Sequence, residues 1–222
     1  MRLFFHWLLD LLYPPKCAFC GSLLTREQTD LCPKCRAELP YAAHDIDRGE
    51  FFRRCVSVFY YEDAVRESIL RYKFHGAQSY ARVYGRLLSM LLLERGVEFD
   101  VLTWVPVSRR RLRKRGYDQS RLLAEAVARE LSVPCVRTLK KTRNNPAQST
   151  MQAFAERRAN VLGVYTPFNV QSFAGKRVLL LDDVFTSGAT LSEASRVLLT
   201  AGAARVECAT VAAVRDEKKS GR

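Results

Sequence analysis

Two adjacent acids, Asp182 and Asp183, follow an apolar run and precede a turn of small residues with hydroxyl groups. The run Val178–Leu181 predicts a strand buried on both faces, in the middle of a parallel sheet. The acids therefore emerge at the carboxyl end of that strand, which is the edge where open α/β sheets bind ligands. The turn offers hydroxyls, backbone N–H groups and a helix N-terminus to a phosphate. Its residues are Thr186, Ser187, Gly188, Ala189 and Thr190. The pattern predicts a ligand that carries hydroxyls and a phosphate together.

A purely structural interpretation is the alternative, in which the acids only end a strand and the turn only caps a helix. Buried strands rarely close on two unpaired acids, so we favour a ligand site. Two other phosphate motifs are excluded. Gly175-Lys176 precedes the strand and no Gly-Lys-Ser/Thr occurs, so the stretch is not a Walker A loop. The absence of Gly-x-Gly-x-x-Gly argues against a dinucleotide-binding fold.

The same stretch resembles the phosphoribosyl pyrophosphate (PRPP) motif of type I phosphoribosyltransferases. That motif consists of an apolar strand, two acids, two apolar residues and a turn rich in Thr, Ser and Gly. The resemblance implies that Asp182 and Asp183 accept hydrogen bonds from the ribose 2′- and 3′-hydroxyls. It also implies that residues 186–190 surround the 5′-phosphate.

A strongly basic segment follows the strand predicted at Val101–Val105. Six of the seven positions from Arg109 to Arg115 are Lys or Arg. A solvated surface is the simple interpretation of such a run, but parallel strands would place it at the same sheet edge as the two acids. That position makes the run a candidate for binding pyrophosphate. The formal net charge of +13 favours polyanionic partners, without choosing between nucleic acid, nucleotides and pyrophosphate.

Four of the seven cysteines form two Cys-x2-Cys pairs, Cys17 with Cys20 and Cys32 with Cys35. Two such pairs supply four thiolates in tetrahedral geometry, as in zinc ribbons, and we expect them to bind a structural zinc ion. An iron–sulfur cluster is the main competitor. We expect metal loss to unfold this segment while sparing the sheet. The odd cysteine count and the paired spacing argue for a reducing cytosol rather than a disulfide framework, so we expect a cytoplasmic protein.

The remaining elements follow from hydrophobic periodicity. It predicts strands at 55–61, 101–105, 133–136, 161–165 and 205–214, and helices at 64–72, 83–94 and 119–131. The basic segment 139–160 has no clean period, and its length favours a functional loop over plain surface. We therefore predict an α/β domain at 50–216, with a type I phosphoribosyltransferase-like open parallel sheet flanked by helices. A smaller unit at 1–45 holds an N-terminal helix and the zinc ribbon.

The first residues carry an apolar run that His6 and Asp10 interrupt. It is too short to span a bilayer, which needs about 20 apolar residues. No small-residue cleavage site follows, which argues against a signal peptide. The spacing of Leu3, Trp7 and Leu11 favours a short amphipathic helix on the body of the protein, and we expect no membrane association.

The order of the parts resembles the ComF family, in which a four-cysteine ribbon precedes a phosphoribosyltransferase-like domain. Nearly the whole chain is covered, through CAFC, CPKC, YKFHG, VPVSRRRLRKRGYDQS, QSTMQAFAERRAN and the PRPP motif. The resemblance implies a role in natural competence, the uptake of single-stranded DNA for transformation, with competence proteins as partners. Asp118 stands where the family usually has Asn, and Ser187 where it usually has Thr. The acid at 118 would either pin its loop or weaken the hold on pyrophosphate.

Two functions remain open on this basis, and the first is an enzyme. PRPP with Mg²⁺ would lie across the strand ends, and pyrophosphate would leave as a nucleophile attacks the ribose anomeric carbon. The protein would contribute positioning and electrostatics. The predicted catalytic residues are Asp182, Asp183, Arg109 and Arg115, and further predicted ligand contacts are Lys73, Ser108 and Arg157. Mg²⁺ would be bound mainly by PRPP oxygens, with few protein ligands.

The second function is a binding module that recognises a phosphoribosyl nucleotide and single-stranded DNA. The predicted nucleic-acid contacts are Arg110, Arg111, Arg113 and Lys114. Aromatic residues beside arginines suit stacked, sequence-tolerant binding of single strands. The aromatic candidates are Trp7, Tyr72, Phe74 and Tyr117. Titration with PRPP, and then with single-stranded DNA, would distinguish the two functions.

Overall fold

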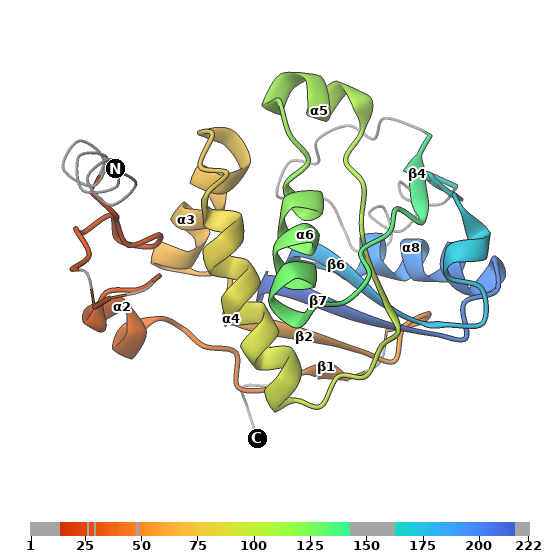
Figure 1. Ribbon diagram of the computed structural model, residues 1–222, viewed down its shortest axis with the longest axis horizontal. Coiled ribbons are helices and arrows are strands. Elements are labelled where there is room, and N and C mark those ends of the chain that lie inside the picture. The colour runs from red at the N-terminus through yellow and green to blue at the C-terminus, as the bar shows by residue number, and fades with distance from the viewer. Residues whose placement is uncertain (1–13, 26, 29, 48, 143–162, 216–222) are drawn as a thin grey trace, which may run out of the picture.

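A five-stranded sheet forms the centre of the computed structural model, which describes residues 14–25, 27–28, 30–47, 49–142 and 163–215. Its strands lie in the order β1 (Ile46–Asp47), β2 (Arg54–Tyr60), β7 (Arg205–Ala213), β6 (Arg177–Phe185) and β3 (Val101–Trp104). All neighbouring strands are parallel except the short β1, which runs antiparallel to β2 (Figure 1). The open parallel sheet expected from the sequence is therefore confirmed, and β6 lies between β7 and β3 as an interior strand.

Helices cover both faces of the sheet. One face holds α3 (Asp63–Phe74), α4 (Tyr80–Glu94) and α6 (Gln119–Leu131), and the other holds α8 (Ala189–Thr200) (Figure 1). Along β6, Leu179 and Leu181 belong to the first core, whereas Val178 and Leu180 belong to the second. All four are at most 1% exposed, so the apolar run is buried on both faces as predicted.

Close approach of α4 and α6 depends on Gly85. A Cβ atom at this position would lie only 2.5 Å from the Cβ of Ala126, so any larger residue would push the two helices apart. This contact matters for the site, because the first turn of α6 lies beside the acids of β6.

The cysteine segment contains α2 (Pro33–Glu38) and shares the main core of the sheet domain. Phe19 is 1% exposed and contacts the rings of Phe59 and Tyr84 edge-on. Ser68 of α3 donates a hydrogen bond of 2.6 Å to the carbonyl of Ala18. The side chain of Phe19 fills space between the sheet and α4. We therefore revise the expectation that metal loss would unfold this segment alone.

Some predicted elements differ from the structure. The strongly basic run after the strand predicted at Val101–Val105 is a helix, α5 (Arg109–Arg115). Ser108 caps its start, and Gly116 ends it in a left-handed conformation. The strand expected at 133–136 is reduced to a single bridge between Cys135 and Leu102. Of the strand expected at 161–165, residues 161 and 162 are not described, Gly163 and Val164 lie outside any strand, and Tyr165 begins β5 (Tyr165–Pro167). Strand β5 pairs with β4 (Leu139–Lys141) in a separate two-stranded sheet and is followed by the short helix η1 (Val170–Ser172).

Residues 1–13, where the sequence predicts a helix, and most of segment 139–160 lie outside the described residues. Within the described ranges, no helix has the length and apolar character needed to cross a membrane.

Candidate functional site

Strand β6 extends through the two acids instead of ending before them. Its partner β3 stops at Trp104, opposite Leu181, whereas pairing with β7 continues from Asp182, opposite Thr210, to Phe185. The acids therefore lie at the step where the sheet loses one strand. The first turn of α6 occupies the space beside this step, as the hydrogen bonds of both acids show.

Asp182 is half-buried and is held by one of its two oxygens. Its Oδ1 accepts hydrogen bonds from Ser120 Oγ and from the backbone N–H of Asp183, both at 2.9 Å. Burial, followed by the negative charge of Asp183, raises the pKa of Asp182 to about 7. Its Oδ2 forms no hydrogen bond with a described residue, which leaves this oxygen for a ligand hydroxyl.

Asp183 is 5% exposed and has partners on both oxygens. Lys73 Nζ, from the last turn of α3, lies 2.7 Å from Oδ1. Gln119 Nε2, from the first turn of α6, donates to Oδ2 at 2.9 Å. The structure thus brings Lys73 and Asp183 together as predicted for one site, but as an ion pair.

Arg115 reaches the same group of residues from the end of α5. Its Nη1 donates to Gln119 Oε1 at 2.7 Å, and its guanidinium lies over the ring of Phe74, 4.6 Å from the centroid. Burial lowers the pKa of Arg115 from its ordinary value. Gln119 and Ser120 were not among the predicted site residues, although both belong to the segment that carries the family resemblance. Their polar side chains at the start of an amphipathic helix were the available signal.

The turn after β6 leads into α8 with the geometry of an anion cradle. Gly188 adopts φ 73° at the N-cap position, and no side chain caps the first N–H groups of the helix. Acidic residues are absent from the first turn of α8. Thr186 is exposed, while Ser187 and Thr190 are half-buried and Ala189 is buried. A Cβ on Gly188 would lie 2.8 Å from the ring of Phe185, so this glycine is required by the local fold.

The start of α5 borders a cavity of about 750 Å³, and neither Asp182 nor Asp183 belongs to its lining. Arg109 is exposed and lines this cavity, as do Lys140 and Lys141. Ser108 is buried, and its Oγ accepts from the backbone N–H of Arg111 at 3.3 Å, so it serves as a helix cap. Arg109 therefore lies at this cavity and is not in contact with Asp182 or Asp183.

Asp118 pins the loop between α5 and α6. Its carboxylate accepts from the backbone N–H groups of Val107 at 3.2 Å and Arg121 at 3.1 Å. Burial raises its pKa from the ordinary value. An acid at this position was expected either to pin its loop or to weaken the hold on pyrophosphate, and the structure shows that it pins the loop.

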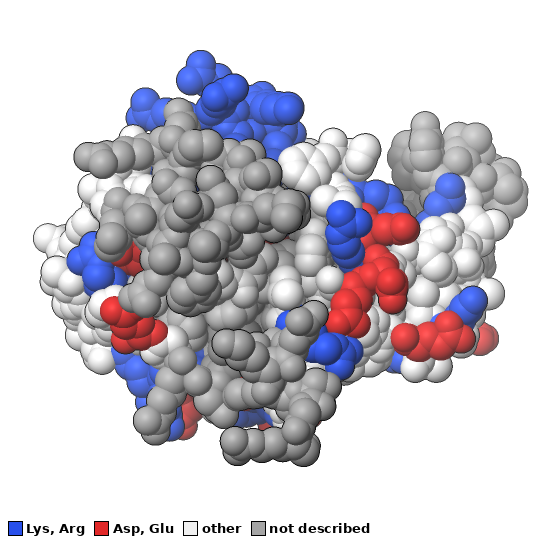
Figure 2. Space-filling model, turned by 180° about the vertical axis from the view of Figure 1, so that it is seen from behind, with Lys and Arg blue, Asp and Glu red and all other residues white. Residues whose placement is uncertain are grey.

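Most of the basic side chains of α5 are exposed, in contrast to Arg115. Arg110, Arg113 and Lys114 are exposed, Arg111 is half-buried, and no residue of the helix is buried. Figure 2 shows Lys and Arg gathered at the end of the molecule where α5 lies in Figure 1. The aromatic residues predicted to stack on bases differ in exposure. Phe74 is 57% exposed, but Tyr72 and Tyr117 are buried and cannot stack on bases. Trp7 and Arg157 lie outside the described residues.

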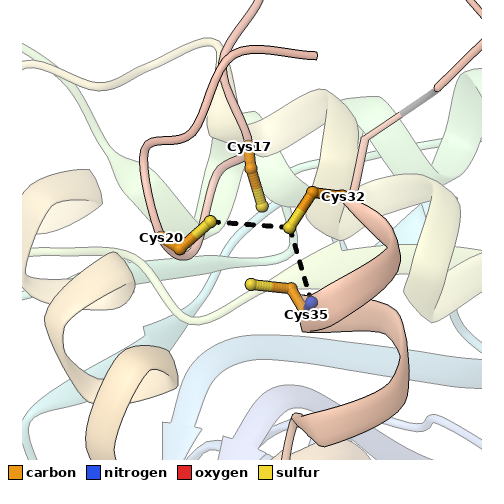
Figure 3. Close-up of side chains that lie close together, drawn as sticks. All are labelled: Cys17, Cys20, Cys32 and Cys35. Atoms are coloured by element: carbon orange, nitrogen blue, oxygen red, sulfur yellow. Dashed lines mark hydrogen bonds between the residues drawn. The ribbon is translucent and has the colours of Figure 1, made fainter. Parts of the chain in front are cut away.

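The four cysteines converge as predicted. The Sγ atoms of Cys17, Cys20, Cys32 and Cys35 all lie within 4.8 Å of one another (Figure 3). Cys20 and Cys32 have their sulfurs 3.6 Å apart. A zinc ion with Zn–S distances of about 2.3 Å places its tetrahedral sulfurs about 3.8 Å apart, so this spacing fits zinc. Gly21, at φ 77°, donates its N–H to the carbonyl of Cys17 and closes the first knuckle.

These features define the class of the protein: a phosphoribosyltransferase fold joined to an N-terminal zinc ribbon. The family model of the phosphoribosyl transferase domain matches residues 118–222, and that of the double zinc ribbon domain matches residues 8–46. The ribbon match and the close cysteines together support a structural zinc ion.

Three relatives cover most of the chain. Competence protein ComFC of Bacillus subtilis is 30% identical over 85% of this chain and 79% of its own length. Competence protein ComFC of Streptococcus pneumoniae is 30% identical over 86% of this chain and 84% of its own. DNA utilization protein YhgH of Escherichia coli is 29% identical over 86% of this chain and 87% of its own. The chain belongs to the ComF family.

Proposed function

We propose that the carboxyl edge of the main sheet binds PRPP or a phosphoribosyl nucleotide. One observation carries the proposal: two adjacent carboxylates near the end of β6 are followed, after a short turn, by the N-terminus of α8, whose N-cap residue makes no side-chain hydrogen bond. Asp182 Oδ2 is the acceptor for a ribose hydroxyl, and Asp183 supplies the second carboxylate. The N–H groups at the start of α8, with the hydroxyls of Thr186, Ser187 and Thr190, receive the 5′-phosphate.

Lys73 and Arg115 support binding of the pyrophosphate end. They come from α3 and α5 and meet beside Asp183, which places two cations next to the proposed ribose position. Arg109 adds a third cation at the start of α5. In a transfer reaction these groups would stabilise the charge on departing pyrophosphate, which is the usual protein contribution to such chemistry.

Mg²⁺ would accompany PRPP. Carboxylate oxygens are suitable ligands for this ion, but Asp183 has both of its oxygens engaged by Lys73 and Gln119. The residues present therefore suit an ion bound mainly by oxygens of the ligand. When bound, the ion would neutralise negative charge on the pyrophosphate.

The names of the relatives support a role in natural competence. Single-stranded DNA is the second candidate ligand, and the exposed cations of α5 favour it. Arg110, Arg113 and Lys114 form no ion pair with a described residue, so their charge is available to phosphates. Binding there would leave the carboxyl edge free for a phosphoribosyl group, in keeping with a cytoplasmic protein that handles incoming DNA.

Calorimetric titration of the zinc-loaded protein with PRPP and Mg²⁺ tests the proposal. Asp182→Asn should weaken binding about tenfold, since a hydrogen bond to a charged acceptor contributes roughly 1.5–3 kcal/mol. Ser187→Asp should weaken it further by repelling the phosphate, while the added acid suits the helix N-terminus and preserves the fold. Ser187→Asn is the matched uncharged control. Failure of the parent protein to bind PRPP, or equal binding by all variants, would refute the site.

Release of pyrophosphate on addition of nucleophilic acceptors distinguishes transfer from binding alone. A protein that binds PRPP and releases no pyrophosphate with any acceptor acts as a binding module.

A further inference from the structure

Gln119 connects a residue of the proposed ribose site with a residue of the proposed pyrophosphate site. It is the first residue of α6 and is 5% exposed. Its Nε2 donates to Asp183 Oδ2 at 2.9 Å, and its Oε1 accepts from Arg115 Nη1 at 2.7 Å. We propose that Gln119 is a positioning residue that couples the two ends of the ligand site, an inference that rests on the proposed function.

The amide of Gln119 has only one favourable orientation between its neighbours. Its carbonyl oxygen faces the guanidinium of Arg115, and its NH₂ group faces the carboxylate of Asp183. The reversed orientation would direct an N–H toward donors and an oxygen toward an acceptor. An amide is suited to this place because it offers a donor and an acceptor on one planar group.

The backbone of Gln119 is fixed as well. Its carbonyl accepts a hydrogen bond of 2.6 Å from the hydroxyl of Tyr72, and the hydroxyl of Tyr117 in turn donates to the carbonyl of Tyr72. Tyr72 adjoins Lys73, which holds the other oxygen of Asp183. The last turn of α3 therefore supports both partners of Asp183.

A ligand that touches both ends should consequently show coupling between them. In the proposed site, pyrophosphate contacts Arg115 and the ribose hydroxyls contact the acids. Gln119 holds Arg115 and Asp183 in a fixed relative position. Coupling between two ligands is reciprocal, so it can be measured from either end. Ribose 5-phosphate and pyrophosphate are the separate probes of the two halves, and PRPP is the joined ligand.

A double-mutant cycle with Gln119→Leu and Arg115→Leu tests the proposal by titration with PRPP and Mg²⁺. Each single change should weaken binding about tenfold. The double variant should be within about threefold of Arg115→Leu alone, because residues in one hydrogen-bond network are not additive. Gln119→Glu retains the acceptor for Arg115 but adds a negative charge beside Asp183, so affinity for ribose 5-phosphate should fall more than affinity for pyrophosphate.

Ser68→Ala is the control for stability, because it removes buried hydrogen bonds to the carbonyl of Ala18 and to Tyr84 away from the site. It should lower the melting temperature and leave ligand affinity unchanged. Additive effects in the cycle, or equal loss of both fragments in Gln119→Glu, would overturn the proposal while PRPP binding by the parent still stands. Absence of PRPP binding by the parent would overturn the proposed function and this inference together.

Discussion

Lys73 Nζ and Asp183 Oδ1 lie 2.7 Å apart, in an ion pair whose side chains are 18% and 8% exposed. The lysine lies in the last turn of α3 and the acid lies near the carboxyl end of β6, so the pair ties a helix to the carboxyl edge of the sheet. In the proposed site, the pyrophosphate of a ligand would compete with Asp183 for this lysine. The ion pair therefore serves both the stability of the free protein and the proposed binding of anions.

Lys73→Met should lower the free energy of unfolding by about 3 kcal/mol, because it leaves the carboxylate of Asp183 buried without its cation. Combining it with Asp183→Asn should recover part of this loss, since no uncompensated charge then remains. Urea unfolding of the ligand-free proteins measures both values. A double variant less stable than Lys73→Met would contradict this account of the pair.

Asp182 should make the stability of the ligand-free protein depend on pH. Its pKa rises from the ordinary value of 3.8 to about 7 in the folded protein, so between these values the folded state binds more protons than the unfolded state. Stability is therefore lost as the pH rises from about 4 to about 7. Asp182→Asn removes this effect, and its melting temperature relative to the parent should increase across that window.

Calorimetric scans at about pH 4, 6 and 8 follow the difference, with each kcal/mol worth about 2–4 °C for a chain of this size. Asp183→Asn is the matched control and should destabilise the protein near neutral pH, because it leaves Lys73 without the carboxylate of its ion pair. A difference between Asp182→Asn and the parent that stays constant with pH would show that Asp182 does not titrate in this way.

Zinc removal should destabilise the whole protein and not only the ribbon. The purified protein is expected to carry about one zinc ion per chain. Cys17→Ser should release it, and the main thermal transition should fall in temperature because Phe19 fills the core between Phe59 and Tyr84. Elemental analysis and melting curves supply the measurements. Iron in place of zinc, or an unchanged transition after metal loss, would count against the prediction.

Binding of single-stranded DNA should depend on the exposed cations of α5. Replacing Arg110, Arg113 and Lys114 with Ala should flatten the slope of log affinity against log salt by roughly two units, because each phosphate contact contributes about 0.7 for single strands. The helix should persist, since Ala is the strongest helix former. Lys34→Ala with Arg36→Ala, in α2, removes two exposed charges away from α5 and serves as the control. An equal slope in parent and triple variant would exclude α5 as the DNA surface.

Sequence patterns alone determined the features that depend on neighbours along the chain. The Cys-x2-Cys spacing predicted the metal centre because each knuckle closes within a few residues, as the hydrogen bond from Gly21 to Cys17 shows. The run Val178–Leu181 predicted an interior strand, because continuous apolar residues are stable in a sheet only when both faces are covered. The helix of residues 109–115 was missed, although Ser108 and Gly116 carried its start and stop signals.

Only the tertiary structure decided which residues meet at the site. The pairing of Asp183 with Lys73 and Gln119 joins three segments far apart in sequence, and no local pattern specifies such contacts. Both acids share one motif, yet Asp182 has a raised pKa and an oxygen without a hydrogen-bond partner among the described residues, while Asp183 forms an ion pair with Lys73. Their difference arises from what α3 and α6 place beside each carboxylate, because burial and neighbouring charge, not residue type, determine what a buried acid can do.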